Sequence, residues 1–156
     1  MPLQVRYARW YYVTLEVKMS NDPLSIDAQT FAKSDDRSRL SGVALKAFIK
    51  IVTRWKLSNR EAAALLGISD SSWVRIKRGI RDQPLSHDQM TRASAAIGIY
   101  RGLHILFADT IADNWPKLPN RGPIFQRLSP VDAMIEGGIP AMLETRRYVD
   151  AVRGGL

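Results

Sequence analysis

The stretch "AAALLGISDSSWVRIKRG", residues 62–79, predicts two short helices joined by a tight turn. Ser58 and Glu61 stand three residues apart just before the apolar run. This is the spacing of a capping box, in which each side chain bonds the other residue's backbone amide at the start of a helix. The first helix is therefore expected over about 59–66. It should end at Gly67, because glycine adopts the left-handed conformation without steric cost.

The second helix of this stretch has its own start and stop signals. Ser69 or Asp70 can cap its first turn. The helix is then expected to continue to Arg78, with Gly79 as its stop. A helix, a glycine turn and a second helix are the parts of a helix-turn-helix, a motif that places its second helix in the major groove of DNA.

The residue types along the stretch divide into an inner set and an outer set. The inner set is small or apolar and would lock the second helix onto the body: Ala62, Ala63, Leu66, Gly67, Ile68, Trp73 and Ile76. The outer set is polar or basic, and we predict that it binds DNA: Ser69, Ser71, Ser72, Arg75, Lys77 and Arg78. Ser71, Ser72 and Arg75 are placed to reach base edges, and the last two to hold phosphate. The alternative is a basic amphipathic hairpin whose charges are only solvated.

The net charge of +8 is concentrated in the middle of the chain. Residues 1–40 hold 6 basic and 5 acidic side chains, residues 41–105 hold 11 and 4, and residues 106–156 hold 6 and 6. The three sections therefore carry +1, +7 and 0. A basic block that coincides with a predicted helix-turn-helix is the footprint expected of phosphate-backbone binding, which favours DNA binding over the solvated hairpin.

Composition removes most enzyme chemistries. The chain of 156 residues has no cysteine, so it has no thiol nucleophile and no thiolate metal site, and its only histidines are His87 and His104. His104 falls on an apolar stripe and is expected to be structural. Asp109 and Asp113 lie one turn apart, but no nucleophile or base accompanies them, so we expect a solvated face. We predict no catalytic site, no metal site and no cofactor, and hence a protein that is not an enzyme.

The remaining sequence predicts further helices and no membrane span. No run of about 18 apolar residues exists, and the first residues lack the pattern of a secretion signal, so a cytoplasmic protein is expected. A long helix is expected from residue 40 to 55, with its apolar stripe at Leu40, Val43, Ala44, Ala47, Phe48, Ile51, Val52 and Trp55. Asp35 and Asp36 would begin this helix. A second helical region opens at Ser86 with Gln89 as capping partner, and its stripe is Met90, Ala93, Ile97, Tyr100, His104, Phe107 and Ile111.

The last third begins with a proline-rich loop. "WPKLPNRGPIFQRL", residues 115–128, holds three prolines and a glycine and is the best boundary in the chain. Ser129, Pro130 and Asp132 then set the start of a short helix that should end at Gly137 and Gly138. Pro140 opens the terminal helix, which should stop at residues 154–155. Its apolar stripe would be Ala141, Thr145, Tyr148, Val149 and Val152, which leaves Arg146, Arg147 and Arg153 elsewhere.

The first 35 residues carry no functional prediction. "YARWYYVTLEV" could be a strand, whereas the polar stretch after it is typical of a linker or arm, and Met19 is a plausible alternative start. We therefore predict three parts: an N-terminal arm or linker over 1–35, a helix-turn-helix domain over 36–112 and a partner-binding module over 113–156. The expected fold class is all-α.

Two segments resemble one known family. "SNREAAALLGISDSSWVRIKRG" resembles the Xre-type helix-turn-helix, and "NRGPIFQRLSPVDAMIEGGIPAMLETRRYVDAVRGG" resembles the toxin-binding domain of the Xre/MbcA/ParS antitoxins. The second is the more specific, through a phenylalanine before a Ser-Pro helix start and a terminal helix that closes on Arg-Gly-Gly. The resemblance implies an all-α antitoxin that dimerises, represses its own operon and neutralises an NAD-degrading toxin of the RES class.

The resemblance also implies which residues meet the toxin. The matching positions, with one further arginine of the terminal helix, are Ser129, Pro130, Ile135, Gly137, Arg147, Tyr148, Arg153 and Gly154. Two positions depart from the family pattern: Trp73 stands where a branched aliphatic residue is usual, and Gln126-Arg127 stands where a glycine is expected. The alternative function is a stand-alone, prophage-like transcriptional repressor whose C-terminal helices serve dimerisation.

Overall fold

The computed structural model describes Phe31 and residues 33–155, and every regular element in those residues is a helix. The expected all-α fold class is therefore confirmed. Most of the predicted arm, with its possible strand and Met19, lies outside the described residues. The elements are α2 (Ser34–Arg54), α3 (Asn59–Leu66), α4 (Asp70–Lys77), α5 (His87–Leu106), α6 (Asp109–Asn114), the 3-10 turn η1 (Trp115–Lys117) and α7 (Pro130–Gly154). None of these helices is long and apolar enough to cross a membrane.

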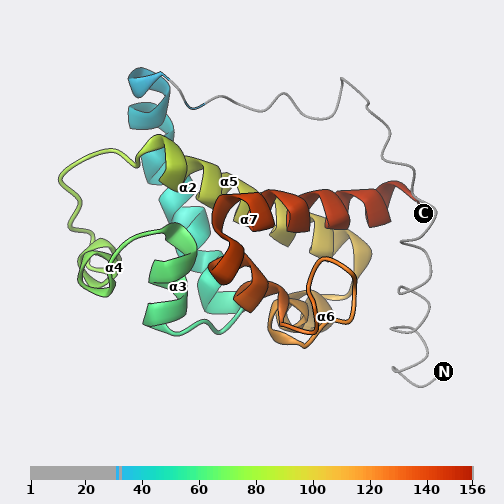
Figure 1. The fold of residues 1–156 in the computed structure, drawn as a ribbon. Helices are drawn as coiled ribbons and strands as arrows, with labels where there is room; N and C mark the ends of the chain where they lie inside the picture. The colour runs from blue at the N-terminus through green and yellow to red at the C-terminus, as the bar shows by residue number, and fades with distance from the viewer. Residues whose placement is uncertain (1–30, 32, 156) are drawn as a thin grey trace.

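Helix α5 is the centre of the fold, because it packs against α2 on one side and against α7 on another. Figure 1 shows α5 and α7 running alongside each other, with α3 and α4 grouped at one end of the molecule. One buried cluster runs through the whole assembly, from Phe48 of α2 through Leu103 of α5 to Met142 of α7. The predicted parts 36–112 and 113–156 therefore share a single hydrophobic core.

The stripe predicted for α2 is buried toward the end of the helix and mostly only partly buried before Phe48. Phe48, Ile51 and Val52 are buried, but Val43 was wrongly placed in the core, since it is 70% exposed. Ser41 is buried instead. Its hydroxyl donates to the carbonyl of Arg37 and accepts a bond of 2.9 Å from the backbone amide of Leu85, so it fastens the chain before α5 to the first helix.

The stripe predicted for α5 describes only part of its buried surface. Met90 and Ala93 are buried as expected, whereas Ile97, Tyr100 and His104 are only partly buried. Phe107 and Ile111 are also partly buried, but they lie beyond α5, which ends at Leu106 instead of continuing through residue 111. The fully buried remainder of α5 consists of small or branched residues: Ala95, Ala96, Ile99, Gly102 and Leu103. The reason is that α7 packs on this second face. A Cβ atom on Gly102 would lie 2.5 Å from Cγ1 of Val149, so glycine is what allows the two helices to approach.

Helix α7 is two helices joined at a kink, as the sequence predicted. Ser129 is the N-cap, accepting a bond of 3.1 Å from the amide of Asp132, and Pro130 occupies the first turn. The backbone is interrupted at Gly138, where φ is 63° and ψ is −148°. Only glycine adopts that conformation at low cost. Pro140 comes two residues later and opens the second half.

Candidate nucleic-acid interface

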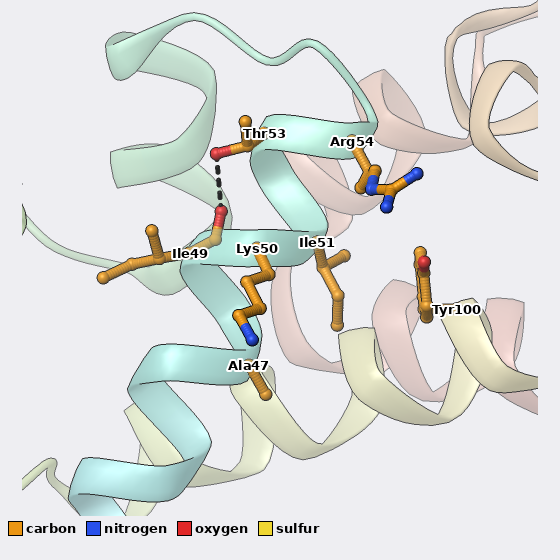
Figure 2. Close-up of a pocket in the computed structure, with 7 residues that line it drawn as sticks. All are labelled: Ala47, Ile49, Lys50, Ile51, Thr53, Arg54 and Tyr100. Atoms are coloured by element: carbon orange, nitrogen blue, oxygen red, sulfur yellow. Dashed lines mark hydrogen bonds between the residues drawn. The ribbon is translucent and has the colours of Figure 1, made fainter.

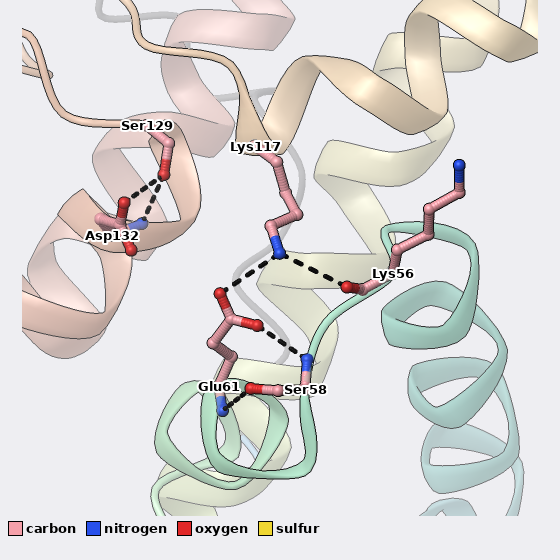
Figure 3. Close-up of polar contacts among 6 residues, drawn as sticks. All are labelled: Lys56, Ser58, Glu61, Lys117, Ser129 and Asp132. Carbon is pink, nitrogen blue, oxygen red and sulfur yellow. Dashed lines mark hydrogen bonds and ion pairs between the residues drawn. The ribbon is translucent and has the colours of Figure 1, made fainter.

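Helices α3 and α4 form the predicted helix-turn-helix. The amide of Ser58 donates to Oε2 of Glu61 at 2.7 Å, and the amide of Glu61 donates to Oγ of Ser58 at 3.2 Å, which completes the capping box (Figure 3). Gly67 ends α3 in the left-handed conformation, with φ of 76°. Ser69, rather than Asp70, is the N-cap of α4. Local sequence signals therefore determine the whole turn.

Helix α4 is anchored by one large side chain. Trp73 is its single buried residue and is 1% exposed. Its ring meets Phe48 edge-on, with centroids 5.9 Å apart, and its Nε1 donates to Oδ1 of Asn59 on α3 at 3.2 Å. An aliphatic residue at this position would lack that bond. Tryptophan at this position thus adds a hydrogen bond between the two helices of the motif.

The outer face of α4 is available to a ligand. The structure leaves all six predicted DNA-binding residues exposed: Ser69, Ser71, Ser72, Arg75, Lys77 and Arg78. The hydroxyl of Ser69 lies 3.1 Å from that of Ser71 and 2.9 Å from that of Ser72, so three hydroxyls gather at the helix N-terminus. A helix N-terminus carries partial positive charge, and hydroxyls both donate and accept. This end of α4 is suited to base edges and phosphate oxygens.

Two basic residues of α4 have polar partners that the sequence did not predict. Nη2 of Arg75 donates to Oδ2 of Asp82 at 2.7 Å, and Nζ of Lys77 donates to Oδ1 of Asn59 at 3.1 Å. Asn59 therefore accepts from both Lys77 and Trp73. These partners lie in a loop and on a neighbouring helix, so no spacing within α4 reveals them.

The residues expected to meet a partner protein divide into two groups. Five of the eight support the fold: Ser129, Pro130, Ile135, Gly137 and Tyr148. Ser129 and Pro130 are buried at the start of α7, and Ile135 packs against the core. A Cβ atom on Gly137 would lie 2.5 Å from Cβ of Ala141. The ring of Tyr148 joins an aromatic cluster, with centroids 5.4 Å from Phe125 and 6.4 Å from Trp115.

The other three residues of that set are exposed near the end of α7. These are Arg147, Arg153 and Gly154. Arg153 lies 3.6 Å from a carboxylate oxygen of Asp150. Arg146 is different, because its side chain is only 23% exposed and lies over Gly98 of α5. The terminal helix therefore has two exposed arginines near its end, whereas the sequence allowed three.

The loop before α7 adopts a glycine-type backbone at the second departure from the family pattern. Gln126 and Arg127 both have positive φ, 49° and 71°, where glycine is the favoured residue. The loop is closed by backbone bonds, because the amide of Asn120 donates to Leu128 at 3.0 Å and Asn120 accepts from the amide of Arg127 at 3.1 Å. Phe125 is 1% exposed and fills the interior. The loop is thus part of the folded body.

Two long basic side chains connect the helix-turn-helix to later parts of the chain. Nζ of Lys117 lies 3.4 Å from Oε1 of Glu61 and donates to the carbonyl of Lys56 at 3.4 Å (Figure 3). Arg92 of α5 donates to the carbonyl of Leu65 at 3.3 Å. The same guanidinium lies beside the Gly67 turn and reaches toward the kink of α7.

The carboxyl group of Glu61 is tuned by these contacts. Partial burial raises the pKa of Glu61, but the hydrogen bonds from Ser58 and the ammonium of Lys117 outweigh that effect, so its pKa lies below the usual value. The carboxylate is charged at neutral pH. It accepts a bond from the amide of Ser58 and pairs with Lys117 at the start of α3.

His104 has the structural role that the sequence predicted. Asp113 was expected to be solvated, but it is paired with His104. Nδ1 of His104 lies 2.9 Å from the carbonyl of Tyr100, and Nε2 lies 3.2 Å from Oδ1 of Asp113. The side chain of Asp113 is 17% exposed and also lies 3.7 Å from Arg54, so the expectation of a solvated face was wrong for it. Asp109, at 85% exposed, is solvated as expected.

A shallow groove of about 540 Å³ lies between α2 and α5. Figure 2 shows Ala47, Lys50, Ile51 and Arg54 along one wall and Tyr100 opposite. Its lining includes no carboxylate, no histidine and no residue of α4. Within the described residues there is also no group of three or more side chains that could hold a metal ion.

The fold and the exposed face of α4 define a helix-turn-helix protein. Residues 36–97 match the antitoxin Xre-like helix-turn-helix domain. The chain is also 34% identical over 124 residues to the uncharacterized protein y4oB of Sinorhizobium fredii (strain NBRC 101917 / NGR234). That alignment covers 78% of this chain and 92% of y4oB, so the chain belongs to the same family as y4oB.

Proposed function

We propose that this chain is the antitoxin of a type II toxin–antitoxin system that neutralises a RES-domain, NAD-degrading toxin encoded by a neighbouring gene and represses its own operon. The observation that carries the proposal is the match of residues 36–97 to the antitoxin Xre-like domain. The exposed polar face of α4 supports DNA binding, and the exposed arginines of α7 support a second binding surface.

The geometry of α4 supports the proposed DNA-binding step. Ser71, Arg75 and Arg78 are spaced by four and three residues and therefore lie along one face of the helix. In the major groove, Arg75 can donate two bonds to guanine, and the hydroxyls can reach either bases or phosphates. Lys77 and Arg78 would neutralise backbone phosphates, which sets affinity but not sequence preference.

Operator recognition needs two copies of this helix. An eight-residue helix contacts too few base pairs to distinguish one site from the many in a genome. A homodimer, or two copies bridged by toxin, would place two α4 helices in successive major grooves about 34 Å apart. The operator is then expected to be a palindrome with half-sites one turn of DNA apart.

The toxin-binding step assigns the exposed end of α7 to the partner. Arg147 and Arg153 are both exposed in this part of the helix. A toxin that degrades NAD must hold a dinucleotide in a pocket, and arginines of α7 can pair with acidic side chains at the rim of that pocket. Occupation of this pocket by the end of α7 would exclude the substrate.

The test uses surface substitutions, because removing the second half of α7 would also remove the buried Met142, Thr145 and Val149. The neighbouring gene is expressed with the wild-type chain, with Arg147→Glu/Arg153→Glu, or with Arg75→Ala/Arg78→Ala. Growth and cellular NAD are measured together with repression of a promoter fusion. The proposal predicts that the α7 variant loses neutralisation and keeps repression, while the α4 variant does the reverse.

Two results would contradict the proposal. A neighbouring gene that is harmless, or that stays toxic beside the wild-type chain, removes the antitoxin role. If repression persists in that case, the chain is a stand-alone repressor and its C-terminal helices serve dimerisation. Loss of both activities in both variants, with melting temperatures unchanged, would show that the two surfaces are not separate.

A further inference from the structure

Arg75 of the recognition helix is already engaged by a carboxylate. Asp82 lies in the loop after α4, and its Oδ2 accepts a bond of 2.7 Å from Nη2 of Arg75. Both side chains are well exposed, at 57% for Arg75 and 73% for Asp82. An exposed ion pair of this kind contributes little to folding stability. We therefore ask how the ion pair changes what the guanidinium of Arg75 can bind.

The end of α4 is built so that Asp82 returns to Arg75. Gly79 has a φ of 79°, its amide donates to the carbonyl of Ile76 at 2.9 Å, and the amide of Ile80 donates to the carbonyl of Arg75 at 3.0 Å. These two bonds and the left-handed glycine form a Schellman motif, which reverses the chain at a helix end. The loop is thereby directed back along the outer face of the helix.

We propose that Asp82 is a specificity-determining residue of the DNA interface, which positions Arg75 as a base reader and keeps it from binding phosphate. This inference rests on the proposed DNA binding. An unpaired arginine at a DNA surface binds any phosphate, and that contact carries no sequence information. With its charge balanced by Asp82, the guanidinium gains less from phosphate and more from a guanine edge that offers two acceptors in one plane.

Holding the side chain also reduces the cost of ordering it. Arginine loses much rotamer freedom when it is fixed in an interface. The bond to Asp82 occupies one side of the guanidinium before DNA arrives and leaves its other donors directed outward. Asp82 also adds a negative charge beside the groove, which lowers affinity for all DNA.

The experiment compares Asp82→Asn with the wild type. A random duplex library is selected with each protein, and the dissociation constants for the enriched site and for a scrambled site are measured between about 100 and 300 mM salt. We expect the ratio of the two constants to fall by about fivefold or more in Asp82→Asn, the size of one lost base contact. Binding to the scrambled site should tighten, and its salt slope should steepen by about 0.9, as for one added phosphate contact.

Two controls separate pairing from charge. Asp88→Asn removes another exposed carboxylate from the basic middle section without touching Arg75, and it should leave the specificity ratio unchanged. In an Arg75→Ala background, Asp82→Asn should have no further effect on the ratio. An equal effect of Asp88→Asn, or a persisting effect without Arg75, would overturn the inference.

The outcomes also distinguish this inference from the proposal beneath it. If the wild-type protein enriches no motif, sequence-specific DNA binding fails and the role of Asp82 fails with it. If the wild type enriches a motif and Asp82→Asn enriches the same motif with the same ratio, only the inference about Asp82 is wrong.

Discussion

Helices α4 and α7 are attached to the same core in opposite ways. Helix α4 buries one residue, Trp73, and exposes most of its polar side chains. Helix α7 buries seven residues along its length and packs closely against α5. The element that we assign to DNA is therefore a short projection with one anchor, whereas the element that we assign to a partner protein is part of the core.

This difference determines how each surface can be tested. Polar substitutions on α4 change what the protein binds without changing its core. Substitutions on α7 are informative at exposed positions such as Arg147 and Arg153, because many other positions contribute to folding. Variants of α4, of α7 and of their contacts with the core can measure how much each helix depends on the core for its stability.

The largest effect is expected at the anchor of α4. Replacement of Trp73 by alanine should lower the free energy of unfolding by about 3–5 kcal/mol, since it empties a fully buried site beside Phe48. Urea unfolding gives the loss, and hydrogen exchange should show α4 unprotected. Trp73→Phe should cost less, because it keeps one buried aromatic ring and loses the bond to Asn59 and part of the indole. Unchanged protection of α4 in the alanine variant would show that the helix has other anchors.

The next effect is expected where α5 meets α7. Gly102→Ala should destabilise by about 1–3 kcal/mol, because the added methyl group would lie 2.5 Å from Cγ1 of Val149. Val149→Ala in the same chain should recover part of the loss. Gly42→Ala is the matched control, since nothing lies within 4 Å of its added methyl group and helix propensity alone should stabilise it by about 0.5–1 kcal/mol. A neutral Gly102→Ala would mean that the two helices can separate without cost.

Removing the N-cap of α7 should cost more stability than removing the N-cap of α4. Ser129→Ala should cost about 1–2 kcal/mol, because Ser129 is 8% exposed and both bonds to Asp132 are partly buried. Ser69→Ala should cost about 0.5–1 kcal/mol, since water can solvate the freed amide of Ser72. Thermal unfolding of the two variants compares them. A larger cost at Ser69 would reverse the contrast between α4 and α7.

The smallest effect concerns the charge of Glu61. Glu61→Gln keeps a side chain that can cap α3 but removes the attraction to Lys117, and we expect a loss of about 0.5 kcal/mol at pH 7. The pKa of Glu61 is lowered in the folded state, so its contribution is present above the unfolded pKa of about 4.3 and disappears as pH falls through the folded pKa. Unfolding measured at pH 7, 5 and 3.5 should show the difference shrinking only at the lowest value. A difference that persists undiminished at pH 3.5 would exclude the charge as its cause.

The sequence predicted what local signals encode. The capping pairs Ser58 with Glu61 and Ser86 with Gln89, the left-handed Gly67 and the kink at Gly138 were all read from a few adjacent residues. The exposure of the six residues predicted to bind DNA, on α4 and at its two caps, followed from the same local pattern. Their role in binding DNA stays a prediction.

Contacts between distant segments could not be read in this way. Periodicity assigns one apolar face to a helix, but α5 packs on two neighbours, so Ile99 and Gly102 were missed. Val43 was misplaced because the described residues leave its side of α2 uncovered. The pairing of Arg75 with Asp82 depends on a loop reversal, and that of Lys117 with Glu61 on how two segments pack.

The most direct test of the account is the affinity of the protein for the DNA immediately upstream of its own gene, compared with a scrambled duplex, at about 150 mM salt. We predict a preference of about a thousandfold or more for the wild type. Arg75→Ala should reduce that preference while leaving the melting temperature unchanged. Equal affinity for the two duplexes would contradict the account, because counterion release from a basic surface would then explain all of the binding.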